Sequence, residues 1–195
     1  MALDKAAHGL QKGLGDLSRF PITASDVHEL QRCQRRLEPR IMLEASLFTP
    51  WGPLQVFSTP TGRDDECQLE RVGEIVRDRL GAGPSLLLGD FTATETSKVL
   101  TKLTVEAGFI DAFRIANPQS NGPTVWQRIE SPESTVSRRV DFILFLNGRA
   151  SNTSVHSSRI LLDHSGQLPD GSTRWPSDHY GLLAELEIVP VHGSE

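Results

Sequence analysis

Three consecutive leucines followed by Gly89 and Asp90 constrain the fold of this chain more than any other feature. The segment 85–88 is short and almost wholly apolar, which predicts a buried strand. Asp90 then places a carboxylate at the exit of that strand, just before the chain enters a helix. Since strand ends are where sheet proteins commonly carry reactive groups, Asp90 is a candidate functional residue. The alternative is that Asp90 only caps the following helix.

The preceding part of the chain predicts a hairpin. Residues 41–48 alternate with period two, which favours a strand with one face more strongly buried. A turn at 49–53 separates it from a second run at 54–59, as in an antiparallel pair with a longer loop. The segment between Ile22 and Arg40 is polar.

Apolar residues at three- and four-residue intervals predict an amphipathic helix that begins at Asp64 or Asp65 and ends near Leu80. The same spacing predicts a second helix that places Val99, Leu100 and Leu103 inward, over residues 94–107. Further strands are expected at 140–146, 155–162 and 180–188.

Helices separated by strands, together with a hairpin, indicate an α+β fold in which sheets form the centre and helices cover the outside. The 195 residues, 37% of them hydrophobic, match one globular domain, so a single domain over 1–195 is expected. The sequence contains no apolar run of about 18 residues, the length that would be needed to span a bilayer. With only Cys33 and Cys67, a reduced, cytoplasmic setting is expected.

The net charge of −5 argues against broad affinity for a nucleic-acid backbone. A DNA substrate would need a local basic patch. The candidates for such a patch, which also suit an ordinary solvated surface, are Arg32, Arg35, Arg36, Arg40, Arg138 and Arg139.

Asp141 is a second candidate, because it lies in an otherwise apolar run and would be costly to bury without a partner. One explanation is an ion pair with Arg138 or Arg139. The other is that Asp141 orients a histidine and stabilises its protonated form.

Ser177-Asp178-His179 supplies such a histidine immediately before the final apolar strand. Neighbouring residues of an extended backbone point to opposite sides, so Asp178 could face a metal while His179 faces a phosphate. Carboxylates that bind Mg²⁺ and a histidine that exchanges a proton are the groups that phosphoester hydrolysis requires. The other histidines are expected to be surface or loop residues: His8, His28, His156, His164 and His192.

The chain resembles the endonuclease/exonuclease/phosphatase superfamily, also called DNase I-like. Three motifs carry this resemblance, in this order along the chain: Gly89-Asp90-Phe91, Arg139-Val140-Asp141-Phe142 and Ser177-Asp178-His179. The likeness covers about residues 13–188. It implies a sandwich of β-sheets with outer helices and a Mg²⁺- or Mn²⁺-dependent phosphoester hydrolase. It also implies roles for individual residues: Asp90 and Asp178 at the metal, Asp90, Thr92, Asp141 and His179 in catalysis, and Arg139 and Trp126 in support and substrate binding.

The chain departs from the family pattern at three places. Thr92 replaces an asparagine, Pro60 follows Ser58-Thr59 where many members have a histidine, and no metal-binding glutamate precedes the match. The resemblance therefore implies a sandwich incomplete at its N-terminus, either truncated or completed by a dimer or a partner chain. The substrate could be a nucleic acid, a phospholipid head group or a small phosphoester. The alternative function is a catalytically impaired member that acts as an interaction module.

Overall fold

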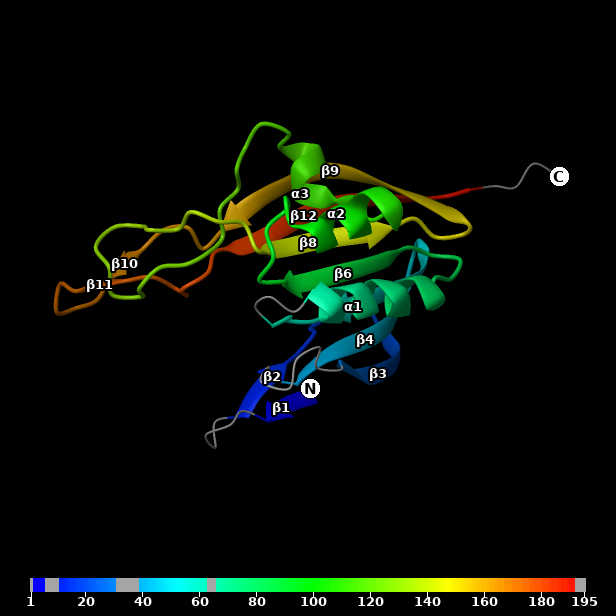
Figure 1. Cartoon of the computed structure of the whole chain (residues 1–195), viewed down its shortest axis with the longest axis horizontal. Coiled ribbons are helices and arrows are strands. Elements are labelled where there is room, and N and C mark those ends of the chain that lie inside the picture. The colour runs from blue at the N-terminus through cyan, green and yellow to red at the C-terminus, as the bar shows by residue number, and fades with distance from the viewer. Residues whose placement is uncertain (1, 6–10, 31–38, 63–65, 192–195) are drawn as a thin grey trace.

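A six-stranded sheet organises the chain in the computed structural model, which describes residues 2–5, 11–30, 39–62 and 66–191. Its strand order is β3-β4-β5-β6-β8-β7 (Figure 1). Strands β5 and β6 pair in parallel, and the other neighbours pair antiparallel. The strands are β3 (Ile22–Leu30), β4 (Arg40–Thr49), β5 (Gly52–Ser58), β6 (Ser85–Asp90), β7 (Ile110–Asp111) and β8 (Asp141–Leu146).

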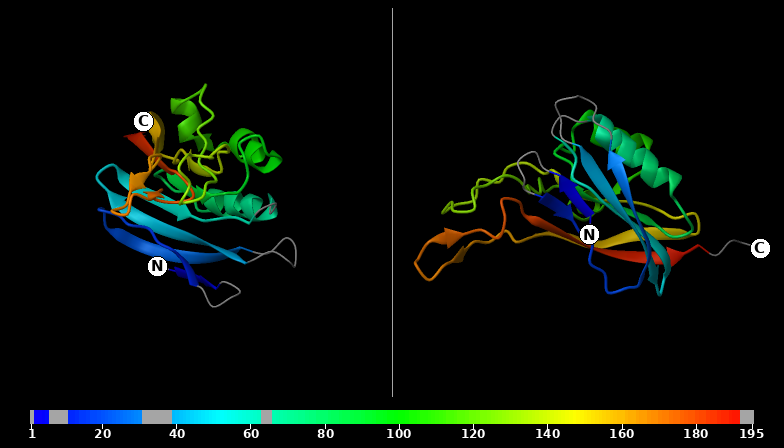
Figure 2. Two further views of the ribbon diagram at one scale, coloured as in Figure 1. Left: turned by 90° about the vertical axis from the view of Figure 1, so that its left-hand side faces the viewer. Right: turned by 90° about the horizontal axis from the view of Figure 1, so that it is seen from below.

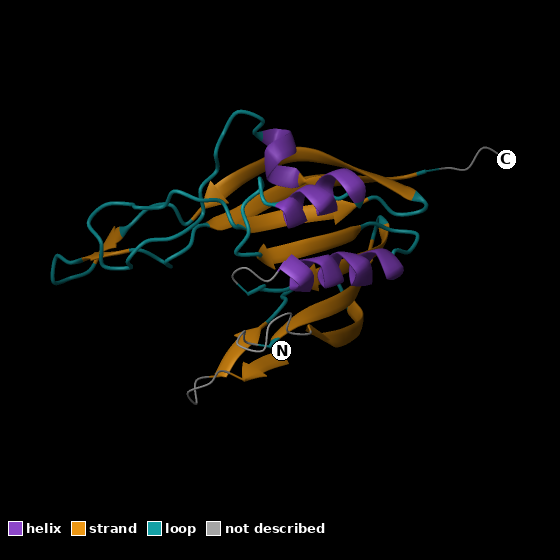
Figure 3. Cartoon of the chain, viewed as in Figure 1, coloured by secondary structure: helices purple, strands orange, loops and turns teal. Residues whose placement is uncertain are grey.

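Two helical segments, residues 66–78 and 98–106, cover one face of this sheet, on the side that faces the viewer in Figure 3. The predicted first helix is confirmed as α1 (Glu66–Asp78), whereas its expected capping residues lie outside the described residues. The second begins later than predicted, with Ser97 as its cap, and changes after one turn from α2 (Lys98–Thr101) to the π-helix η1 (Lys102–Glu106). A short third helix, α3 (Ala112–Ala116), packs against the strand β9.

The core lies between the sheet and α1, α2 and η1. Phe57, Leu87 and Leu144 are fully buried and stand side by side on neighbouring strands. The α2–η1 residues that the sequence predicts to face inward, Val99, Leu100 and Leu103, are at most 4% exposed. Burying a side chain of this size stabilises the fold by about 1.5–3 kcal/mol, so this layer fixes the strand ends that follow Leu87 and precede Leu144.

A second ladder pairs β9 (Ser151–Leu161) with β12 (Gly181–Pro190), antiparallel and with a bulge at Glu185/Leu186. It lies on the side of the large sheet away from α1 and α2 (Figure 2, left). Two small hairpins complete the described elements: β1 (Ala2–Lys5) with β2 (Gln11–Leu14), and β10 (Gly166–Gln167) with β11 (Thr173–Arg174). The chain is thus an α+β protein dominated by sheets with outer helices, as predicted.

One expectation for the first strands needs correction. The polar segment after Ile22 contains β3, an edge strand that pairs with β4 over its whole length. The sequence of β3 shows no hydrophobic alternation, because the side chains of this strand are mostly exposed on both faces. Strand β4 has one face more strongly buried, as predicted: Leu43, Ala45 and Leu47 are all buried, whereas the other face runs from the buried Met42 to Phe48, which is 66% exposed.

Cys67, near the start of α1, is disulfide-bonded, so the expectation of reduced cysteines is not supported. Cys33 lies outside the described residues. Among the described helices, none has the length and apolar character needed to cross a membrane. A cytoplasmic location stays a prediction.

Candidate active site

The first two candidate carboxylates meet at one end of the large sheet. Asp90 is the last residue of β6, Asp141 is the first of β8, and the two are directly paired in the antiparallel register. Each is three residues from a core residue, Leu87 or Leu144, so strand alternation turns both away from the helix-covered face. The long connection from α3 to β8 and the β10–β11 hairpin extend from this same end of the sheet (Figure 1).

His179 reaches this pair from the loop before β12. Its Nδ1 atom lies 2.9 Å from Oδ2 of Asp141, and the two side chains are 26% and 21% exposed. A backbone bridge between Val125 and His179 holds the loop in place. Of the two explanations for Asp141, the structure therefore supports the histidine partner. The competing ion-pair explanation fails for Arg139, whose guanidinium binds Asp111 and Glu95 instead.

The electrostatics of the site link these three groups. The hydrogen bond to Asp141 raises the pKa of His179, and the negative charges of Asp141, Asp90 and Asp178 raise it further, against the opposing effect of burial. Burial raises the pKa of Asp90, and the neighbouring Asp141 adds to that rise, whereas the N–H of Thr92 lowers it. The site thus has an excess of negative charge that a cation would offset.

The loop after Asp90 has an unusual backbone. Thr92 has a φ of 49°, a left-handed conformation that β-branched residues rarely adopt, and its N–H donates to Oδ1 of Asp90 at 2.8 Å. Asp90 therefore binds its own loop and does not cap α2, a role that Ser97 fills. Gly89 is required because a Cβ there would lie 1.8 Å from the carbonyl oxygen of Thr59.

Thr124 is a positioning residue to which the sequence analysis assigns no role. It is fully buried, and its Oγ1 atom accepts from the backbone N–H groups of Val140 at 3.1 Å and Asp141 at 3.3 Å. Its carbonyl oxygen accepts from the N–H of Tyr180 at 2.8 Å. One residue thus connects the strand that carries Asp141 to the loop that carries His179. Thr124 lies within the range of about 13–188 over which the sequence resembles the superfamily, two residues before Trp126.

Asp178 and Trp126 lie on adjoining loops. The carbonyl oxygen of Asp178 accepts from the N–H of Gln127 at 3.2 Å, and the buried Gln127 side chain donates to the carbonyl oxygen of Ser177. Trp126 itself is 52% exposed, so its ring is accessible to a ligand. Substrate binding by Trp126 stays a prediction.

Arg139 has the contacts of a supporting residue. Its guanidinium is 3% exposed, binds the carboxylates of Asp111 at 2.7 Å and Glu95, and stacks over the rings of Phe142 and Phe113. These contacts tie the residue before Val140 to the helix layer. Support of the site and substrate binding by Arg139 both stay predictions.

A divalent cation fits the chemistry of this site only in part. Asp90 and Asp178 are the expected ligands, and the excess of carboxylates around Asp90 suits a cation. Mg²⁺ is commonly held by one or two carboxylates, with water and substrate phosphate as further ligands. In the described part of the chain, however, the closely spaced group of three His, Asp or Glu ligand atoms lies elsewhere, at Asp26, His28 and Glu44.

Comparison with known proteins identifies the fold. No protein-family model and no curated protein matches the chain. Solved structures do match: an endonuclease/exonuclease/phosphatase family protein from Bacteroides thetaiotaomicron has a TM-score of 0.69 at 18% identity, covering 87% of this chain and 66% of that one.

Two further solved structures extend the match. A mannosyl-6-phosphatase from Bacteroides thetaiotaomicron has a TM-score of 0.67 at 18% identity, with 87% of this chain and 67% of that chain covered. The D. rerio protein TDP2, complexed with a single-strand DNA product, has a TM-score of 0.68 at 17% identity, with 85% and 68% covered. The chain spans about two thirds of the length of these structures, and it has the endonuclease/exonuclease/phosphatase, or DNase I-like, fold.

Proposed function

We propose that the chain is a metal-dependent phosphoester hydrolase whose site is built from Asp90, Asp141, Asp178 and His179. The observation that carries the proposal is the 2.9 Å contact between His179 Nδ1 and Asp141 Oδ2, next to Asp90. The similarity in fold to a phosphatase and to TDP2 with a DNA product supports the same reaction class.

In this proposal, Asp141 fixes the tautomer of His179 and favours its protonated form. With Nδ1 bound to Asp141, Nε2 is the nitrogen that can donate to a phosphoryl oxygen. Asp90 orients the attacking water or accepts a proton from it.

Mg²⁺ or Mn²⁺ at Asp90 and Asp178 would neutralise charge on the phosphoryl group and activate water. Trp126, exposed on the adjoining loop, would contact the substrate. The substrate class stays open between a nucleic acid, a phospholipid head group and a small phosphoester.

Hydrolysis assays test the proposal with one substrate of each class and with Mg²⁺, Mn²⁺ or EDTA. We expect metal-dependent activity that His179→Ala reduces by at least about 10²-fold, the usual contribution of a general acid–base group. His156→Ala is the matched control, because His156 is an exposed histidine on β9. Activity that is equal in His179→Ala and in the parent protein contradicts the proposal.

A second candidate function rests on the open edge of β12. Among the described residues, this ten-residue strand pairs only with β9. An unpaired strand edge offers a row of N–H and C=O groups to another strand. We therefore also propose that a second copy or a partner chain completes this sheet. If the protein does not hydrolyse phosphoesters, binding to that chain would be its function.

A further inference from the structure

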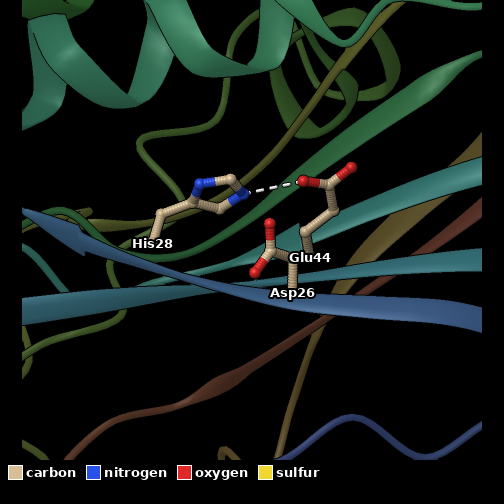
Figure 4. A group of neighbouring side chains, drawn as sticks. All are labelled: Asp26, His28 and Glu44. Carbon is tan, nitrogen blue, oxygen red and sulfur yellow. Dashed lines mark hydrogen bonds and ion pairs between the residues drawn. The ribbon is translucent and has the colours of Figure 1, made fainter.

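Three polar side chains gather on β3 and β4, far from the candidate active site along the sheet. Asp26 and His28 lie two residues apart on β3, and Glu44 is the direct partner of Asp26 on β4 (Figure 4). Strand alternation therefore puts all three on one face. Their ligand atoms lie within 4.8 Å of one another.

The cluster lies on the opposite face of the sheet from Asp90 and Asp141. Glu44 is paired in register with Phe57, which is paired with Leu87, and both of these residues belong to the helix-covered core. Asp90 points away from that core. The cluster is thus a separate site, independent of the proposed hydrolase function.

The burial of Glu44 demands compensation. It is 7% exposed, and its Oε2 atom lies 2.7 Å from Nε2 of His28. Arg79, just after α1, approaches Glu44 at 3.8 Å and Asp26 at 3.6 Å, beyond hydrogen-bond length, and is half exposed. Because the arginine makes no close bond to either acid, it can move aside. A hollow of about 450 Å³ next to the cluster leaves room for the water ligands of an ion.

We propose that Asp26, His28 and Glu44 bind a divalent transition-metal cation of the Zn²⁺ type. One imidazole and two carboxylates suit Zn²⁺ or Mn²⁺ better than Ca²⁺, which prefers oxygen ligands alone. Ligand atoms of a tetrahedral zinc are about 3.4 Å apart, given bonds of about 2.0–2.2 Å. The exposed Asp26 carboxylate can swing inward to reach this spacing.

Such an ion would fasten the exposed edge strand β3 to the buried strand β4. Strand β3 buries little of its own surface, with seven exposed residues among its nine. A cation shared between the two strands binds only when they are paired, so it stabilises the folded sheet by mass action.

Zinc binding to the metal-free protein tests the proposal. The Asp178→Asn protein is titrated with ZnCl₂ against a chromogenic chelator, so that one of the two expected metal ligands of the active site is absent. We expect one bound equivalent in this background, loss of that equivalent on His28→Gln, and affinity about 10- to 100-fold lower on Asp26→Asn. His156→Gln is the matched control and leaves binding unchanged.

Thermal unfolding gives a second measurement on the same proteins. ZnCl₂ should raise the Tm of the Asp178→Asn background and leave that of its His28→Gln variant unchanged. If His28→Gln fails to fold, the half-exposed Asp26→Asn decides the question. No Zn²⁺ bound to the background, or equal binding by the background and the two variants, overturns the proposal and leaves the cluster as an ion-pair network with Arg79.

Discussion

At the scale of single residues, the partners of the buried charged side chains explain most of the arrangement of the candidate site. Asp141 begins an apolar strand, and His179 compensates the partial burial of its carboxylate at 2.9 Å. Arg139, two residues earlier in the chain, binds Asp111 and Glu95 instead. The two charges are close in sequence and could have formed an ion pair, but each one binds other residues: Asp141 binds His179, and Arg139 binds the carboxylates next to the helix layer.

Asp141→Asn should lower the pKa of His179, because it removes the main interaction that raises it. The folded-state pKa of His179 lies above its usual 6.5, so the stabilisation by this pair is complete below about pH 6.5. It is lost as the pH rises through the folded-state pKa. The variant should therefore lose more stability at pH 5.5 than at pH 9.

NMR titration of His179 in metal-free protein and urea unfolding at both pH values measure these effects. Asp163→Asn is the matched control, because Asp163 pairs with a histidine, His164, that is 90% exposed. It should change stability by less than about 0.5 kcal/mol. An unchanged His179 titration in Asp141→Asn would exclude the pair as its cause.

Thr92 stores backbone strain where the family pattern has asparagine. Thr92→Asn should stabilise the protein by about 1 kcal/mol, because asparagine tolerates the left-handed conformation that Thr92 adopts. If the amide also donates to the phosphoryl group, activity should rise by up to about 10²-fold. Thermal unfolding and hydrolysis rates give the two results. Thr92→Gly relieves the strain without adding a donor, so equal activity in both variants would argue against a role for the amide.

At the scale of elements, Thr124 connects β8 to the loop before β12. Thr124→Val keeps the shape but removes the oxygen that accepts from Val140 and Asp141. Leaving these buried N–H groups without that acceptor should cost about 1–3 kcal/mol and reduce activity by misplacing Asp141. Thr124→Ser retains the acceptor and should stay close to the parent in urea unfolding and in hydrolysis. Comparable losses in both variants would point to packing in place of hydrogen bonding.

At the scale of the whole molecule, the unequal sheets are the main feature. The large sheet is covered by helices on one face, whereas the β9–β12 ladder has two strands and an open edge. The matched solved structures are about half as long again as the part that this chain spans. The open edge is where a further strand would add, as in β-augmentation.

Self-association through this edge should be visible as a rise in mass with concentration in light scattering. Val189→Lys, at a half-exposed position of β12, should weaken it, because a charge on an edge strand opposes pairing. Val105→Lys is the matched control on η1, where the valine is 75% exposed. A parent protein that stays monomeric at all concentrations would exclude pairing between two copies and leave a partner chain.

The sequence by itself located most of the local elements and selected the candidate site residues. Period-two alternation located β4, helical spacing located α1, and apolar runs bounded by turns located β5, β6, β8, β9 and β12. The strand-end motifs selected Asp90, Asp141 and His179. These signals are strong because an element that buries one face has apolar residues at regular intervals in the sequence. The choice of partner for Asp141 stayed open, since a sequence contains no distances.

Only the tertiary structure decided which residues meet. Edge strand β3 has no periodic trace because both its faces are largely exposed, so its pairing with β4 depends on backbone hydrogen bonds that any residue can make. His28 was expected at the surface or in a loop, whereas the pairing of β3 with β4 brings its side chain to the buried Glu44, the strand partner of Asp26. Thr124 likewise gained its role from two backbone N–H groups 16 and 17 residues away. Such contacts join distant parts of the chain, and no local pattern records them.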